Sequence, residues 1–182
     1  MSAHRFHPTI LRAYDIRGIF EDTLTTGDAF AIGLSFISIQ KQRGLGNEVT
    51  VGRDGRLSSP ALAAALIDGL VAGGAQVSDI GCGPTPMLYF AAHELGSGGA
   101  IQVTGSHNPP THNGFKMVMG GLSFFGADIE ELGRISAAGP DRTDDGGVVS
   151  RAIEEAYVDR LAAGAVATCL LYTSDAADDC WS

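Results

Sequence analysis

The sequence has few cysteines, and their spacing excludes two common kinds of site. Cys82, Cys169 and Cys180 match neither the ligand spacing of a metal centre nor a disulfide framework. We therefore expect a reducing, cytoplasmic location. Cys82 is expected to be a small buried residue at the end of a strand.

Basic residues are also scarce, and they gather in no patch. The 182 residues include 12 Lys and Arg against 21 Asp and Glu, which gives a formal net charge of −9. Proteins that bind nucleic acid usually show a basic face, so we expect no nucleic-acid partner. An anionic small ligand remains compatible with the sequence wherever a few cations and backbone amides come together.

No apolar segment is long enough to cross a membrane. The longest weakly charged stretch, residues 29–40, falls well short of the about 20 residues that a spanning helix needs. The first ten residues also lack the apolar core of a signal peptide. We therefore expect no membrane partner.

The chain does contain a regular alternation of short apolar strands and helices. Strands are predicted within 11–20 and at 48–52, 75–82 and 100–103, separated by helices that begin near Thr26, Ser58 and Thr85. This order predicts parallel strands with helices on both faces of a sheet. Residues 115–119 form a strand with no helix before it, which favours an antiparallel neighbour. The predicted fold is a three-layer α/β/α domain with a mixed, mostly parallel four-stranded sheet and one antiparallel strand.

The composition changes along the chain in a way that predicts domain boundaries. Residues 1–139 form the first domain, which ends with a helix at about 128–138. Residues 140–150, rich in Gly and Asp, are predicted to be a linker, and 151–167 begin an incomplete second domain. Residues 168–182 lack any periodicity; non-native cloning sequence and a natural disordered tail both fit them.

The segment that follows the strand at 100–103 carries the clearest chemical signal. Gly105 permits an unusual backbone conformation beside Ser106, and two prolines stiffen the far side of the loop. Open α/β sheets present their sites at the carboxyl ends of strands, where this serine and His107 lie. A nucleophile or a phosphate carrier fits this arrangement. A turn with local hydrogen bonds and no chemistry fits the same residues.

Thr104-Gly105-Ser106-His107-Asn108-Pro109 resembles the active-site loop of the α-D-phosphohexomutase superfamily, in which this serine carries a phosphoryl group. Segments at 12–18, 51–56, 84–86 and 113–116 agree with the family in order and spacing. The Tyr-Asp-Ile-Arg-Gly opening and the glycine before the serine favour the phosphomannomutase/phosphoglucomutase branch. A phosphoglucosamine mutase is the alternative within the family.

The resemblance implies a reaction. Members of the family interconvert hexose 1-phosphates and 6-phosphates, here of mannose or glucose, through a phosphoserine and a bisphosphorylated sugar. The implied cofactor is Mg²⁺, bound in part through the phosphate on Ser106, with a hexose 1,6-bisphosphate as activator. The implied partners are hexose phosphates.

The resemblance also implies roles for individual residues. The implied catalytic residues are Ser106, His107, Lys116 and Arg17. The implied substrate-binding or phosphate-binding residues are Tyr14, Arg17, Thr104, Gly105 and Asn108.

Structural roles are the alternatives for three of these residues. Lys116 could lie along a strand with its apolar stem covered, and His107 could only orient the loop. Arg17 could form a structural ion pair with Asp15 or Asp54. The turn residues Arg53, Asp54 and Arg56 are expected to be structural.

The resemblance covers about residues 5–165. The family has four domains, and this sequence lacks the metal loop of the second, the sugar-selecting loop of the third and the phosphate loop of the last. We therefore expect the missing C-terminal domains of the same protein as partners, and little or no mutase activity from this chain alone. Outside enzymes, the alternative is a non-catalytic domain that binds sugar phosphates.

Overall fold

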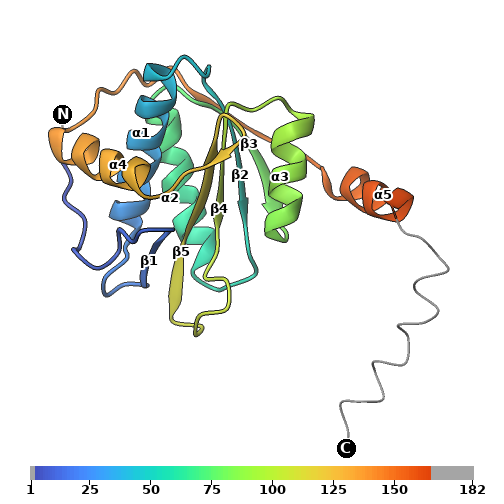
Figure 1. Cartoon of the computed structure of the whole chain (residues 1–182), viewed down its shortest axis with the longest axis horizontal. Helices are drawn as coiled ribbons and strands as arrows, with labels where there is room; N and C mark the ends of the chain where they lie inside the picture. Colours follow the sequence, from blue (N-terminus) through green and yellow to red (C-terminus); the bar gives the residue numbers. More distant parts are fainter. Residues whose placement is uncertain (1–2, 165–182) are drawn as a thin grey trace, which may run out of the picture.

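The computed structural model describes residues 3–164 and arranges them as one sheet between two layers of helices (Figure 1). The elements follow one another as β1 (Ile16–Ile19), α1 (Thr26–Gln42), β2 (Glu48–Arg53), α2 (Ser59–Ala72), β3 (Gln76–Cys82), α3 (Thr85–Glu94), β4 (Gly99–Val103), β5 (His112–Met119), β6 (Leu122–Ser123), α4 (Ala127–Ala138), β7 (Gly147–Ser150) and α5 (Glu154–Gly164). Helices α1, α2 and α4 lie on one side of the sheet and α3 on the other (Figure 1). The predicted three-layer α/β/α fold is confirmed.

The strands are ordered β1-β5-β4-β2-β3-β7, and β6 pairs with the free part of β5. Strand β5 is antiparallel to β1, β4 and β6, while the pairs β4–β2, β2–β3 and β3–β7 are parallel. A single strand, β5, therefore runs against the others, as the sequence predicts. The predicted count of four strands is too low, because the sheet built from the described residues has seven.

The additional strands are short and lie at the margins of the sheet. Strand β7 falls inside 140–150, where the composition predicts a linker, and it pairs with β3 from Gln76↔Gly147 to Asp79↔Ser150. Its Val148 and Val149 are both half exposed. The sequence of this edge strand therefore lacks the alternation of buried apolar and exposed polar residues that predicts a strand. The domain limits themselves remain a prediction, and the predicted tail at 168–182 lies outside the described residues.

Two apolar cores form because side chains alternate between the faces of each strand. On β2 and β4, Val49, Val51, Ile101 and Val103 point into the larger core, under α1, α2 and α4. Ala100 points the other way, into the smaller core under α3. The alternation places every second residue of the central strands on the face that α3 covers only in part.

Helix α1 is packed on more than one side, in agreement with the apolar residues that lie off its main stripe. A Cβ atom on Gly33 would lie 2.3 Å from the carbonyl oxygen of Leu66, and one on Gly69 would lie 2.0 Å from that of Phe30. Glycine at these positions lets the backbones of α1 and α2 come into direct contact. Thr25 and Asp28 close the first turn of α1 as a capping box.

Cys82 is exposed at the end of β3, so the prediction of a buried cysteine was wrong. The chain leaves the sheet at this point, three residues before α3 begins at Thr85, and no neighbouring element covers the thiol.

Helix α5 extends from the main body on the side of α3 (Figure 1), and none of its residues is buried. Its contact with the domain includes the rings of Phe90 and Tyr157, whose centroids are 5.7 Å apart.

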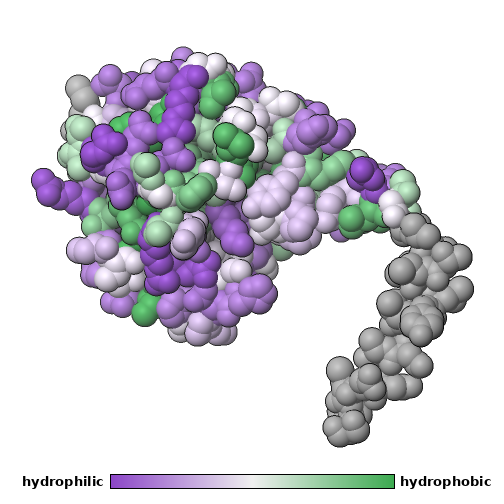
Figure 2. Space-filling model, viewed as in Figure 1, coloured by the Kyte–Doolittle hydropathy of each residue, from purple (hydrophilic) through white to green (hydrophobic). Residues whose placement is uncertain are grey.

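Hydrophilic and hydrophobic residues are interspersed on the face seen in Figure 2. Within residues 3–164, no helix combines the length and apolar character that a membrane span requires.

Candidate functional site

The loop between β4 and β5 holds Ser106 in an uncommon backbone conformation. Its φ angle is +51°, in the left-handed region, which costs a residue other than glycine about 1–2 kcal/mol. The Ser106 N–H donates to Oγ1 of Thr104 over 2.9 Å, and Nδ2 of Asn108 donates to the carbonyl of Gly105 over 3.1 Å. These bonds stabilise the turn around the serine.

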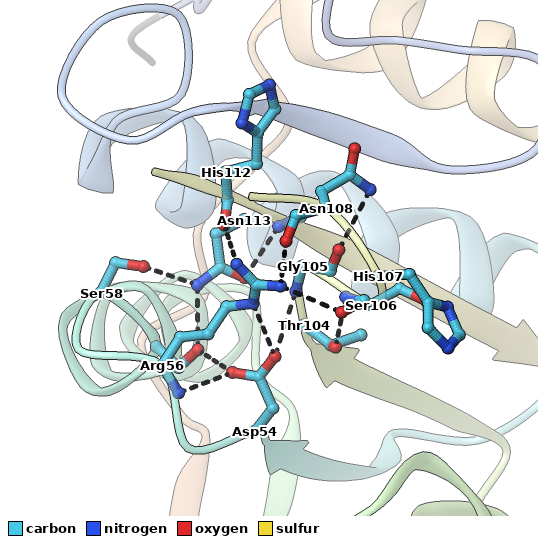
Figure 3. A network of polar contacts seen from close by, with 12 residues as sticks. Asp54, Arg56, Ser58, Thr104, Gly105, Ser106, His107, Asn108, His112 and Asn113 are labelled. Carbon is cyan, nitrogen blue, oxygen red and sulfur yellow. Dashed lines mark hydrogen bonds and ion pairs between the residues drawn. The ribbon is translucent and has the colours of Figure 1, made fainter. Parts of the chain in front are cut away.

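The hydroxyl of Ser106 lies on the open side of the loop. Its Oγ is 3.1 Å from Nδ1 of His107 and donates to this nitrogen when the nitrogen carries no proton. The imidazole is exposed and projects away from Arg56 (Figure 3). The predicted pairing of a displayed hydroxyl with an imidazole is therefore present.

On the inner side, one guanidinium group binds the backbone of the same loop. Nη1 of Arg56 donates to the carbonyls of Pro109 and His112 over 2.7 and 3.1 Å. Its Nη2 donates to those of Ser106 and Asn108 over 3.0 and 2.7 Å. Figure 3 shows the side chain reaching across from the turn after β2 to these oxygens. Four carbonyl groups of the loop are thus turned toward one cation.

Asp54, from the same turn, connects this arginine with the loop. Its Oδ2 accepts from the N–H of Gly105 over 3.1 Å and lies 3.3 Å from Nε of Arg56. Its Oδ1 accepts from the backbone of Arg56 over 3.1 Å and from the hydroxyl of Ser59 over 2.5 Å. Burial alone would raise the pKa of Asp54, but hydrogen bonds from Ser59, Arg56, Thr104 and Gly105 outweigh it and lower the pKa below its usual value.

The start of α2 supports the turn from below. Ser58 takes the N-cap position, but its side chain makes no capping hydrogen bond. Instead, Nδ2 of the buried Asn113 donates to the hydroxyls of Ser58 and Ser59 over 2.8 and 2.9 Å. Asn113 lies on β5, so this contact joins α2 to the strand that leaves the serine loop.

Lys116 and Arg17 lie on the same face of the sheet. Arg17 is opposite Gly114 on β5, and Lys116 is opposite Gln102 on β4. Directly opposed residues share a face, as do residues two apart on one strand. Both cations therefore project from the face that carries α3, close to the end of β4.

Arg17 is held by Asp15 rather than by the serine loop. Its Nη2 donates to Oδ2 of Asp15 over 2.5 Å, and its Nε is buried without a partner among the described residues. Within residues 3–164, no hydrogen bond or ion pair joins it to the Ser106 loop. Tyr14 is 83% exposed in the segment before β1. These two predicted residues thus stay apart from Ser106 in this chain.

No metal centre is formed by the described part of the chain: residues 3–164 contain no group of three or more His, Cys, Asp or Glu side chains that could hold an ion. A phosphate on Ser106 would offer oxygen ligands, but the remaining ligands of a Mg²⁺ site are not among these residues.

The predicted site residues thus fall into two groups. Residues 104–108 form one ordered loop, while Lys116 on β5 and Arg17 on β1 project from the face of the sheet that carries α3. The loop suits a hydroxyl that takes up and passes on a phosphoryl group, with Lys116 and Arg17 as cations on the same face of the sheet. The sequence predicts structural roles for Asp54 and Arg56, but not that they hold this loop. That contact follows from the pairing of β2 with β4, whose carboxyl ends lie side by side.

Comparisons with known proteins identify relatives of this chain. The family described as phosphoglucomutase/phosphomannomutase, alpha/beta/alpha domain I, matches residues 8–141. A phosphomannomutase/phosphoglucomutase of Pseudomonas aeruginosa PAO1 is 51% identical over 124 residues, which are 68% of this chain and 27% of that protein. A phosphoglucomutase of Neisseria gonorrhoeae is 46% identical over 123 residues, covering 68% and 26%.

A solved structure shares the fold. The crystal structure of a phosphoglucomutase/phosphomannomutase family protein from Burkholderia thailandensis aligns with a TM-score of 0.80 and 42% identity, over 85% of this chain and 35% of that one. The chain therefore spans about a quarter to a third of the length of the proteins that it resembles.

Proposed function

This chain belongs to the phosphoglucomutase/phosphomannomutase family as its α/β/α domain I, and from that premise we propose that Ser106 is the phosphoryl-carrying serine of an enzyme that interconverts hexose 1-phosphates and 6-phosphates. The observation that carries the proposal is the loop itself, which holds Ser106 at φ +51° with its hydroxyl on the open side. A mannose or glucose phosphate is the proposed substrate, in line with the names of the relatives.

The proposed chemistry is a reversible phosphoryl transfer. As the bond between phosphorus and Oγ of Ser106 breaks, a new bond forms between phosphorus and a hydroxyl oxygen of the sugar. That hydroxyl loses its proton, and Oγ gains one. After the bisphosphorylated sugar has turned round, the reverse transfer moves its other phosphoryl group to Ser106. Such transfers depend on positioning and on balance of charge more than on covalent assistance.

The neighbouring residues have proposed roles in this transfer. Lys116 stabilises the phosphate charge of about −1.5 to −2 or moves the proton, and His107 binds phosphate or substrate. Arg17 and Tyr14 contact the substrate once the rest of the protein is present. In the loop itself, the backbone around Gly105 and the side chains of Thr104 and Asn108 contact the phosphate.

Further components belong to the same proposal. Members of this family generally depend on Mg²⁺, which would neutralise phosphate charge, with ligands from the C-terminal domains in addition to the phosphate on Ser106. A hexose 1,6-bisphosphate would phosphorylate Ser106 and activate the enzyme. The 182-residue chain alone is expected to have little or no mutase activity, and the expected location of the whole protein is cytoplasmic.

A domain exchange tests the proposal. Residues 8–141 of this chain would replace the matching domain of the Pseudomonas aeruginosa relative, and turnover of glucose 1-phosphate and mannose 1-phosphate would be measured with Mg²⁺ and glucose 1,6-bisphosphate. We expect activity, a phosphoryl group on Ser106 by mass spectrometry, and loss of both in Ser106→Ala. Ser123→Ala, which removes an exposed hydroxyl on β6, is the matched control.

The outcomes separate the alternatives. An exchange protein that folds but turns over neither sugar phosphate and takes up no phosphoryl group would contradict the proposal. Because the sugar-selecting loop of the exchange protein comes from the relative, this experiment tests phosphoryl transfer at Ser106 and leaves the choice of sugar to an assay of the complete protein.

A further inference from the structure

Arg56 and Asp54 have no part in the chemistry proposed above, yet both form hydrogen bonds with the serine loop. Arg56 donates to the carbonyls of residues 106, 108, 109 and 112, and Asp54 accepts from the N–H of Gly105. Both residues come from the turn after β2, some 50 positions earlier in the chain.

We propose that Arg56, oriented by Asp54, is the positioning residue that turns the carbonyl groups of the loop inward and thereby presents the Ser106 hydroxyl outward for phosphoryl transfer. This inference rests on the proposed function of Ser106. Arg56 itself touches no reacting atom, since its bonds are to backbone oxygens and to Asp54.

The charge of a phosphoserine supplies the physical reason. Carbonyl oxygens carry partial negative charge, so carbonyl groups directed at a phosphate dianion would oppose it. Arg56 binds the carbonyls of Ser106 and Asn108 on the inner side, over 3.0 and 2.7 Å. The open side of the loop then presents the Ser106 hydroxyl, and hydrogen-bond donors rather than carbonyl oxygens face a phosphate there. A fixed cation on the inner side also lowers the cost of placing two further negative charges on Ser106.

Only an arginine can make this set of bonds. Its planar guanidinium offers five N–H donors in a fixed fork, and here both terminal nitrogens donate twice while Nε faces Asp54. A lysine at the same position would keep the charge, but it has a single nitrogen with three donors and could not bind four separated carbonyls.

Gly105 is fitted to the same guanidinium. A Cβ atom at this position would lie 2.4 Å from both Cζ and Nε of Arg56, well inside contact distance. Arg56 cannot move aside without losing bonds to the loop. The glycine next to the serine is therefore required by the arginine on the inner side, and substitution of either residue should disturb the same part of the loop.

The test uses the full 182-residue chain, labelled with ¹⁵N, and measures amide hydrogen exchange. In Arg56→Lys, the exchange of Gly105 and Asn108 should quicken by about tenfold or more, because hydrogen bonds to a charged group are lost. Arg43→Lys is the matched control: Arg43 binds Asp128 and Glu131 over 2.7 and 2.6 Å, on the side of α1 and α4. It should leave the serine loop unchanged.

A second variant guards against an Arg56→Lys chain that does not fold. Gly105→Ala keeps Arg56 but displaces its guanidinium, and it should quicken the exchange of Ser106 and Asn108 while amides of β2 and β4 keep their protection. Guanidinium ion added to Arg56→Ala at a concentration too low to denature should restore slow exchange at Gly105, whereas sodium chloride at equal ionic strength should not.

Unchanged exchange at Gly105 and Asn108 in folded Arg56→Lys, or equal loosening of the loop and the central strands, would overturn the inference. Neither readout depends on phosphorylation. If the amide exchange is unchanged but Ser106 carries a phosphoryl group in the domain exchange, only the role of Arg56 is rejected. If the amide exchange quickens as expected but Ser106 takes up no phosphoryl group, only the proposed function is rejected.

Discussion

The serine loop and the segment at 12–17 lie on opposite sides of β5, and they are held in different ways. Residues 104–112 are bound by Arg56 and Asp54, which belong to another part of the chain. At the start of β1, Arg17 pairs with Asp15, two residues away, and Tyr14 just before the strand is 83% exposed. The side chains that hold the first region come from a distant part of the chain, whereas the ion pair of the second region joins close neighbours.

The difference indicates which part of the site this domain can prepare by itself. A loop fixed by long-range charged hydrogen bonds keeps its geometry without substrate, and such pre-organisation favours phosphoryl transfer. The segment with Arg17 and Tyr14 offers a cation and a ring whose proposed contacts are with substrate and with the rest of the protein. The two regions should therefore respond to substitution with unequal losses.

The largest loss is expected from Arg56→Ala. The free energy of unfolding should fall by about 3 kcal/mol, because the substitution leaves several loop carbonyls and Asp54 without their charged partner. Urea denaturation measures this loss. A loss no greater than that of Arg17→Ala would contradict the inference that the serine loop depends more strongly on its side-chain contacts than the segment at 12–17.

Asp54→Asn should lower the free energy of unfolding by about 2 kcal/mol at neutral pH. The pKa of Asp54 is lowered in the folded state, so the stabilisation is present above its unfolded pKa of about 3.9 and is lost as the pH falls through the folded value. The difference in the free energy of unfolding between wild type and variant should therefore decrease when urea denaturation is repeated at progressively lower pH. Asp159→Asn, on the exposed α5, is the matched control and should leave the free energy of unfolding at neutral pH unchanged.

Gly105→Ala should cost about 1–2 kcal/mol, since the added methyl group is overpacked against the guanidinium of Arg56. The double variant with Arg56→Ala tests the cause, because removing the guanidinium also removes the clash. The two losses should then sum to more than the loss of the double variant. Simple additivity would show that Gly105 is needed for another reason.

The smallest loss is expected from Arg17→Ala, at about 1 kcal/mol, because its ion pair with Asp15 joins neighbouring residues and holds no distant segment. Asp15→Asn should cost a similar amount. Denaturation of the double variant measures the coupling within the pair. A loss as large as that of Arg56→Ala would place a structural role on the N-terminal segment as well.

Local patterns were sufficient for much of the fold. The alternation of strands and helices predicts the three layers, and the missing helix before 112–119 predicts the antiparallel β5. Strand β7 was missed because its two valines are half exposed and follow a stretch rich in Gly and Asp. Cys82 was misjudged because burial depends on what packs over a strand end, which composition does not record.

By itself, the sequence determined the class of fold, the loop that carries Ser106 and the family to which the chain belongs, because strand periodicity, turn residues and short motifs are local properties. The tertiary structure alone decided that Arg56 binds the loop and Arg17 binds Asp15. The turn after β2 meets the loop after β4 only when the two strands pair in parallel register, from Val49↔Gly99 to Arg53↔Val103. Such long-range contacts depend on how the sheet is assembled, which no local pattern records.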